Sequence, residues 1–149
     1  MEKMSYTRFI ITMAISFFVM YIVMFLNMES IVHYHTSLSR IYMAILMIAP
    51  MAVIMLLLMG KMYPDKKLNT GIILAALILF TVTFTALRTQ TPIGDMQYMR
   101  AMISHHSSAI MTSKNANITD PEVKKLSEKI IQSQEDEIKQ MELILERMK

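Results

Sequence analysis

Three long runs of apolar residues without a charged side chain constrain this chain most strongly. They cover about residues 9–28, 41–59 and 71–87. An α-helix needs roughly 20 mainly apolar residues to cross a hydrocarbon core about 30 Å thick. The first two runs are long enough, and the third is short. We therefore predict an all-α protein whose residues 1–90 form a membrane domain with three transmembrane helices.

The third run also contains polar residues that a membrane helix can tolerate. A threonine hydroxyl can bond to a backbone carbonyl of its own helix, and Gly71 can extend the run. We expect such bonds from Thr70, Thr81, Thr83 and Thr85. Of the 149 residues, 54% are hydrophobic, more than a small water-soluble protein needs. The bilayer is thus the expected solvent and partner of residues 1–90.

Composition also restricts the available chemistry. The chain has 18 methionines, no cysteine and no tryptophan, so disulfides, cysteine zinc sites and catalytic thiolates are excluded. Methionine is the only sulfur donor. The net charge of +3 is scattered along the chain, which predicts no nucleic-acid partner.

Basic residues beside the apolar runs predict the orientation in the membrane. Lys3 and Arg8 precede the first run, and three lysines follow the second, at positions 61, 66 and 67. Loops rich in Lys and Arg usually remain in the cytoplasm. The first run is too long for the apolar part of a signal peptide, so we expect a retained anchor. We predict a cell (inner) membrane protein with a cytoplasmic N-terminus and a periplasmic or extracellular C-terminal domain.

Residues 91–149 have the composition of a soluble segment and predict a helical hairpin. A helix can start near residues 93–95 and end near Asn115, where a turn is expected. A second helix can start at the capping box Thr119-Asp-Pro-Glu122 and continue to about Met148. We predict an extracytoplasmic antiparallel pair of helices.

At 100° per residue, each helix of this hairpin has one continuous stripe. On the first helix it comprises Asp95, Met99, Met102, His106, Ala109, Ile110 and Ser113, with His105 at its edge. On the second it comprises Val123, Leu126, Ile130, Gln134, Ile138, Met141, Leu145 and Met148, with Glu137 inside it. A fold about residue 117 would bring Met99 and Met102 level with Gln134 and Glu137.

These donors favour a soft metal ion. Thioether sulfur with imidazole suits Cu(I) and its chemical relative Ag(I), whereas a nearby carboxylate would help to retain Cu(II). Zinc prefers more His or Cys, and calcium and magnesium need oxygen ligands. We predict a copper site with Met99, Met102, His105 and His106 as leading ligands. Asp95 and Glu137 would be auxiliary ligands or would anchor the ligands by hydrogen bonds, and Gln134 would orient one of them. Protonation of the imidazoles below about pH 6 should weaken binding.

Other interpretations of the same residues remain open. Methionines at helical spacing often fill a core, and Glu137 could pair with His106 by a buried hydrogen bond. His33 and His35 form a weaker candidate site and could equally be interfacial side chains beside Tyr34. A di-iron oxidase needs paired Glu-x-x-His motifs, which the sequence lacks, so we do not expect an enzyme.

The hairpin sequence resembles the bacterial family labelled "domain of unknown function 305". The resemblance is carried by Asp95, Met99, Met102-Ile103-x-His105-His106, Ala109-Ile110, Asp120-Pro121-x-Val123, Leu126, Ile130-Ile131-x-x-Gln134-x-x-Glu137-Ile138-x-x-Met141. It implies a ferritin-like fold, an extracytoplasmic location and, for some members, copper binding and tolerance. Three spans followed by one hairpin resemble a membrane-anchored branch of the family.

Two features depart from that family pattern. Ser104 stands where many members have proline before the histidine pair, and only one hairpin is present where a ferritin-like bundle needs four helices. Because two helices bury little surface alone, we expect a homo-oligomer. The predicted function is capture or buffering of copper without chemical turnover. The alternative is a non-metal structural or interaction module of the cell envelope.

Overall fold

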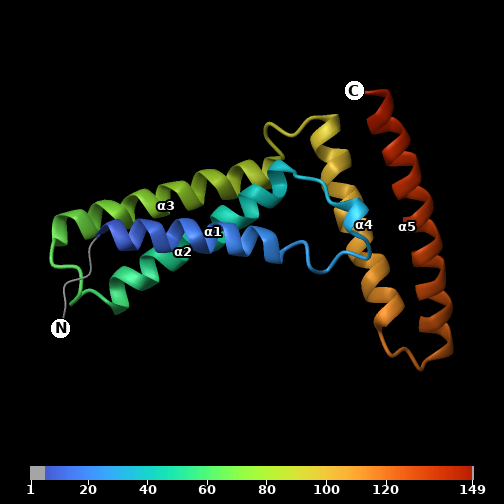
Figure 1. Ribbon diagram of the computed structural model, residues 1–149, viewed down its shortest axis with the longest axis horizontal. Helices are drawn as coiled ribbons and strands as arrows, with labels where there is room; N and C mark the ends of the chain where they lie inside the picture. The colour runs from blue at the N-terminus through green and yellow to red at the C-terminus, as the bar shows by residue number, and fades with distance from the viewer. Residues whose placement is uncertain (1–5, 149) are drawn as a thin grey trace. The chain divides into compact units, whose positions relative to one another are not determined.

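The computed structural model describes residues 6–148, and within this range it is all-α with no β-strand, as the sequence predicted. The described residues form five α-helices and one short 3₁₀ helix, η1, and Figure 1 labels the α-helices. Their bounds are α1 Tyr6–Val23, η1 Ile31–His33, α2 Leu38–Leu58, α3 Lys66–Thr89, α4 Asp95–Asn115 and α5 Pro121–Arg147. Lys3, which contributed to the predicted orientation, and Lys149 lie outside the described residues.

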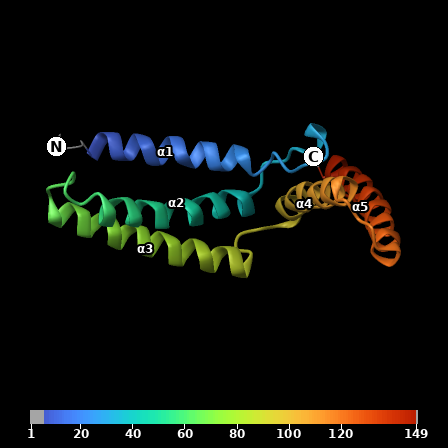
Figure 2. The ribbon, with the colours of Figure 1, turned by 90° about the horizontal axis from the view of Figure 1, so that it is seen from below.

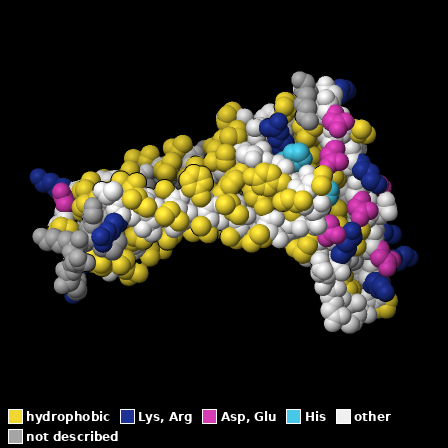
Figure 3. All heavy atoms as spheres, in the orientation of Figure 1, with side chains coloured by type: hydrophobic (Ala, Val, Ile, Leu, Met, Phe, Trp, Pro, Cys, Tyr) yellow, Lys and Arg dark blue, Asp and Glu magenta, His cyan; other side chains and the backbone are white. Residues whose placement is uncertain are grey.

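Three of these helices, α1, α2 and α3, are long and apolar enough to cross a membrane. Many of their large apolar side chains are exposed, for example Phe18 at 63% and Leu58 at 82%. Figure 3 shows apolar side chains covering these helices, while the charged side chains gather on α4 and α5. An apolar surface of this extent is unfavourable in water and suits a lipid environment.

The first and third apolar helices differ in length from their predicted spans. α1 ends at Val23 instead of continuing to residue 28. The reason is that Phe25 turns away from the helix and is buried, with its ring centroid 4.4 Å from that of Tyr34. α3 is longer than predicted, because Asp65 caps it by accepting a 3.0 Å hydrogen bond from the backbone N–H of Leu68.

The threonines of α3 behave largely as the sequence suggested. Thr70, Thr81 and Thr85 each donate a 2.9 Å hydrogen bond to the carbonyl four residues earlier. Thr83 was wrongly included, since it makes no such bond within the described residues, and Thr89 makes it instead, also at 2.9 Å. These bonds satisfy hydroxyl groups that lipid could not solvate.

The chain divides into two compact units, which we call the apolar unit (residues 6–23 and 39–92) and the hairpin unit (24–38 and 93–148). The core of the apolar unit contains Phe9, Ala52, Leu56 and Tyr63. Phe9 comes from α1, and Ala52 and Leu56 come from α2.

In the hairpin unit, α4 and α5 run antiparallel and side by side in both ribbon views (Figures 1 and 2). Their shared core consists of Ile103, Ile110, Ile138, Met141 and Leu145. α4 begins and ends where the sequence predicted.

The cap of α5 is Asp120 rather than the predicted Thr119. One oxygen of Asp120 accepts 2.9 Å hydrogen bonds from the N–H groups of Glu122 and Val123. Its carboxylate thus occupies the favourable position at the positive end of the helix dipole.

Candidate metal centre

The buried face of α4 is rotated relative to the predicted stripe. Ile103, which the stripe omitted, is 0% exposed, and Ile110 is 1% exposed. His106 is 7% exposed and belongs to this face, whereas Asp95 lies exposed in the first turn. The two isoleucines set the rotation because they bury the most apolar surface against α5.

The pairing of α4 with α5 is also shifted along the helices. The Ser127 hydroxyl donates a 3.4 Å hydrogen bond to the carbonyl of Ser113, and His106 lies opposite Glu137. Met99 and Met102 were predicted to be level with Glu137, so this register expectation was wrong. The difference arises because α5 begins only after the linker 116–120, later than a fold about residue 117 implies.

The contact between His106 and Glu137 joins α4 and α5, the two helices of the hairpin. Nδ1 of His106 lies 3.2 Å from Oε2 of Glu137. The two groups are not aligned for a hydrogen bond, so the buried Nδ1 has no hydrogen-bond partner within residues 6–148. Oε1 of Glu137 accepts a 3.0 Å hydrogen bond from Ser133, which holds the carboxylate on α5.

Burial lowers the pKa of His106 below its ordinary value. The carboxylate of Glu137 acts in the opposite direction and raises this pKa, while His105 lowers it further. The effect of burial dominates, because removing an imidazolium from water costs more than a half-exposed carboxylate returns. His106 is therefore held as a neutral imidazole at neutral pH, the form that binds metals.

A second buried polar atom without a partner belongs to α5. Oε1 of Gln134 is buried and accepts no hydrogen bond from the described residues. Met99 and Met102, both half-buried, pack against the hairpin core from the α4 side. The seam thus combines two thioethers, one imidazole and one amide oxygen on facing helices. Buried polar atoms without partners are uncommon and call for an explanation such as a bound ion or water.

The remaining predicted ligands are not gathered at this seam. His105 is exposed, and its ring centroid is 6.0 Å from that of His106. The carboxylate of Asp95 contacts no partner in the part of the chain that the structure describes. No group of three or more His, Asp and Glu side chains in residues 6–148 is arranged to hold a metal ion. A metal held here would have to use the methionine sulfurs.

The segment 24–38 packs on another face of α4, a contact that the sequence did not predict. His33 Nδ1 lies 2.9 Å from the hydroxyl of Ser107, and the Ser104 hydroxyl donates a 3.1 Å hydrogen bond to the carbonyl of His33. The N–H of Glu29 donates to Ser107 Oγ at 3.0 Å. Both serines are 0% exposed. Their spacing on one helix face was the available signal, because small polar side chains let a backbone approach closely.

Next to this contact, a groove of about 390 Å³ runs between the segment 24–38 and α5. Lys114 crosses it, with Nζ 3.1 Å from Oε1 of Glu29 and 3.2 Å from Oε1 of Glu135. The hydrogen bonds that Lys114 donates to Glu29 and to Glu135 raise the pKa of Lys114. Lys114 therefore pairs directly with one carboxylate from the segment 24–38 and one from α5.

Together these features define a class of all-helical protein in which three candidate membrane-spanning helices accompany a two-helix hairpin with a sulfur- and imidazole-lined seam. The chain belongs to the family described as "Domain of unknown function (DUF305)", whose model matches residues 81–146. It is 40% identical over 114 residues to "Uncharacterized protein L153" of Acanthamoeba polyphaga mimivirus, covering 75% of this chain and 73% of that relative.

The similarity to this relative is longer than the region that the family model matches, so it also extends into the apolar unit. No solved structure matches the chain.

Proposed function

We propose that this protein is a membrane-anchored metal-binding protein that captures or buffers copper outside the cytoplasm. The preferred ion is Cu(I), and Ag(I) and Cu(II) are chemically related alternatives. Binding is reversible coordination without chemical turnover. The basic residues between α2 and α3 favour a cytoplasmic location for that loop, which leaves the hairpin in the periplasm or cell exterior.

One observation carries this proposal: two buried polar atoms, one on each helix of the methionine-containing hairpin, have no hydrogen-bond partner within residues 6–148. They are His106 Nδ1 on α4 and Gln134 Oε1 on α5. We propose His106, Met99 and Met102 as the ligands, with Glu137 and Gln134 orienting the imidazole. Methionine and neutral imidazole form the donor set that favours Cu(I) over harder ions.

His105 and Asp95 lie at the edge of this arrangement, and we propose that they interact with a neighbouring copy of the chain. A ferritin-like bundle needs four helices, so a second hairpin would cover the exposed side of α4 and α5. His105, three residues after Met102 on α4, would then face the second hairpin. The oligomer thereby completes both the fold and the ligand set.

The test is a competition titration of Cu(I) between the full-length protein in detergent and a chromogenic Cu(I) chelator. We expect the double variant Met99→Leu/Met102→Leu to lose at least about tenfold in affinity, because leucine keeps the volume but removes the sulfur. Met96→Leu is the matched control, since Met96 also packs on the hairpin core. Equal affinity of the wild type and the double variant would overturn the proposal.

A second candidate function is a structural or interaction module without metal. The 3.2 Å contact between His106 and Glu137 favours it, because it links the helices without an ion. In that case added Cu(I) and chelators would both leave the melting temperature unchanged. A metal-binding hairpin should instead be stabilised by excess ion according to its affinity.

A further inference from the structure

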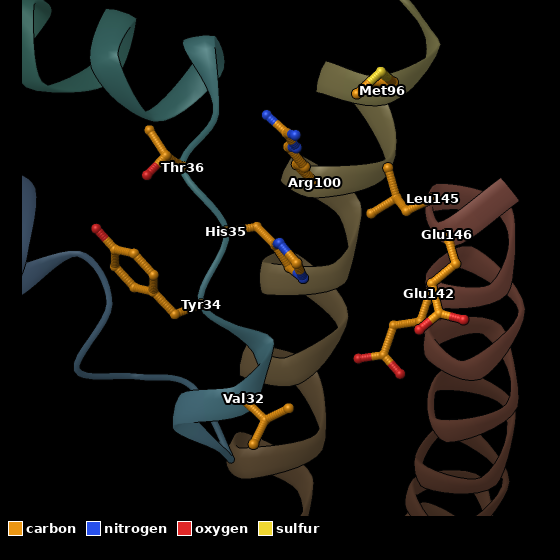
Figure 4. A pocket seen from close by; sticks show the side chains of 9 residues that line it. All are labelled: Val32, Tyr34, His35, Thr36, Met96, Arg100, Glu142, Leu145 and Glu146. Carbon is orange, nitrogen blue, oxygen red and sulfur yellow. The ribbon is translucent and has the colours of Figure 1, made fainter. Parts of the chain in front are cut away.

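The proposed function leaves unexplained a cavity of about 560 Å³ in the hairpin unit, at the end distant from the α4–α5 turn. Figure 4 shows its walls, which come from three parts of the chain. Segment 24–38 contributes residues 32 and 34–36, α4 contributes Met96 and Arg100, and α5 contributes Glu142, Leu145 and Glu146. Glu142 also borders the groove that Lys114 crosses, so the two hollows lie along the same side of α5.

Opposite charges line this cavity without neutralising each other. Arg100 reaches from α4 toward the segment 24–38, whereas Glu142 and Glu146 project from α5 (Figure 4). Within the described residues, none of these three side chains makes an ion pair or hydrogen bond. Arg100 and Glu142 are half-buried, so both have lost part of their hydration.

The neighbouring groove that Lys114 crosses differs from this cavity in how its charges are paired. There Lys114 lies within 3.2 Å of two carboxylates and forms an ion pair with each. In the 560 Å³ cavity a cation and a pair of anions stay apart on separate walls, with the apolar side chain of Leu145 beside them. This distribution complements a small zwitterion, whose cationic end would meet the glutamates and whose anionic end would meet the arginine.

The side chains on each wall of the cavity further restrict the class of ligand. Two carboxylates suit a primary ammonium, which has three N–H donors, better than a quaternary ammonium, which has none. The planar guanidinium of Arg100 suits an oxyanion with several oxygens, such as a phosphate diester. A phosphoethanolamine group carries both ends, joined by a short apolar link.

Chain connectivity favours a lipid as the source of this group. Thr36 lines the cavity only two positions before Leu38, the first residue of the candidate membrane helix α2. Two extended residues span at most about 7 Å. The headgroup layer of a bilayer is roughly 5–8 Å deep on each side. If α2 spans the bilayer, this wall of the cavity lies at headgroup level.

We propose that this cavity binds the phosphoethanolamine headgroup of a phosphatidylethanolamine lipid. The ammonium lies between Glu142 and Glu146, and the phosphate lies against Arg100. This inference rests on the membrane anchoring in the proposed function and is independent of metal binding. Its role is to hold the hairpin unit at the membrane surface through a specific lipid.

The test uses metal-free, full-length protein in detergent and native mass spectrometry. Short-chain phosphatidylethanolamine, phosphatidylcholine and phosphatidylglycerol are offered in equal amounts. We expect phosphatidylethanolamine to be retained about tenfold better than either, because only it presents both an ammonium with N–H donors and a phosphate. Equal retention of all three lipids would overturn the proposal.

Variants of the charged residues that line the cavity test whether the lipid binds there. Arg100→Gln should reduce retention of phosphatidylethanolamine about tenfold, and Glu142→Gln/Glu146→Gln should remove its advantage over phosphatidylcholine. Arg147→Gln and Glu128→Gln are matched controls, because both side chains are exposed on α5 and outside the cavity. Circular dichroism checks that each variant is folded. Unchanged retention in folded Arg100→Gln protein would exclude this cavity.

Two further measurements distinguish lipid binding from binding of a free zwitterion and from metal binding. Binding of soluble phosphoethanolamine without binding of the lipid would overturn the membrane assignment in favour of a free zwitterion. Cu(I) affinity measured on the same variants should remain that of the wild type. Loss of lipid selectivity with unchanged Cu(I) affinity would therefore separate this site from the proposed metal centre.

Discussion

At the scale of single residues, His106 has the most unusual environment in the hairpin. Its imidazole is 7% exposed and contacts a carboxylate, yet its Nδ1 lacks a hydrogen bond within residues 6–148. Burial opposes the charged form more strongly than Glu137 favours it, and the pKa is lowered. A neutral imidazole in this position is ready to coordinate an ion but vulnerable to acid.

The lowered pKa of His106 predicts that the metal-free hairpin loses stability in acid. In the unfolded chain the imidazole takes up a proton near pH 6.5, whereas in the folded chain it does so only at lower pH. The unfolded state thus binds more protons between these values, and the stability present above about pH 6.5 is lost as the pH falls.

The melting temperature of metal-free protein, measured in detergent from about pH 7.5 to about pH 5, tests this prediction. His106→Asn should flatten the decline, because asparagine cannot take up the proton. His105→Asn should retain the decline of the wild type, since that neighbouring imidazole is exposed. A decline that is identical in all three proteins would contradict the assignment to His106.

At the scale of elements, the segment 24–38 is the part of the fold that sequence patterns did not predict. The pattern of apolar residues continues to residue 28, so the end of α1 at Val23 could not be located from periodicity. The docking of this segment on α4 depends on Ser104 and Ser107, whose spacing on one helix face indicates that a backbone can approach there but not which segment does so. Only the tertiary contact reveals their role.

Other elements were predictable because local physical chemistry determines them. Thr70, Thr81 and Thr85 of α3 bond to carbonyls of their own helix, and α5 begins at an Asp-Pro pair that suits a helix start. In contrast, the sides of α4 and α5 that face each other depend on which apolar side chains become most deeply buried. On α4, Ile103 and Ile110 determined this side. The seven candidate ligands could therefore be named from the sequence. The sequence did not predict how the candidates on α4 align with those on α5.

The serine contact predicts the effect of Ser107→Ala on the segment 24–38. This change removes one of the two acceptors of the Glu29 N–H, leaving the Ser107 carbonyl at 3.3 Å, and it removes the partner of His33, with an expected cost of about 1–3 kcal/mol for docking. Amide hydrogen exchange at residues 29–34 should accelerate by about tenfold or more. Ser108→Ala is the matched control, because the Ser108 hydroxyl donates only to the Ser104 carbonyl within α4, at 3.1 Å. Equal exchange in both variants would show that the segment is held by other contacts.

At the scale of the whole molecule, the hairpin has an apolar surface that its own two helices do not cover. The stripe predicted on α5 is buried only in its C-terminal half, around Ile138 and Leu145. In the N-terminal half, Val123 is 49% exposed, Leu126 57% and Ile130 37%. A second copy of the chain would cover these side chains and complete a bundle of four helices.

Leu126→Glu tests this assembly, because a carboxylate placed in an apolar interface loses its hydration without gaining a partner. We expect wild-type protein in detergent to have a mass of at least two chains by light scattering, and the variant to dissociate at concentrations at which the wild type remains assembled. Leu143→Glu is the matched control: Leu143 is 68% exposed and lies on the side of α5 that faces away from α4. If both variants dissociate equally, added charge alone explains the effect. A wild type with the mass of a single chain would leave the exposed stripe to lipid or another protein, and the metal seam would then have to function without a second hairpin.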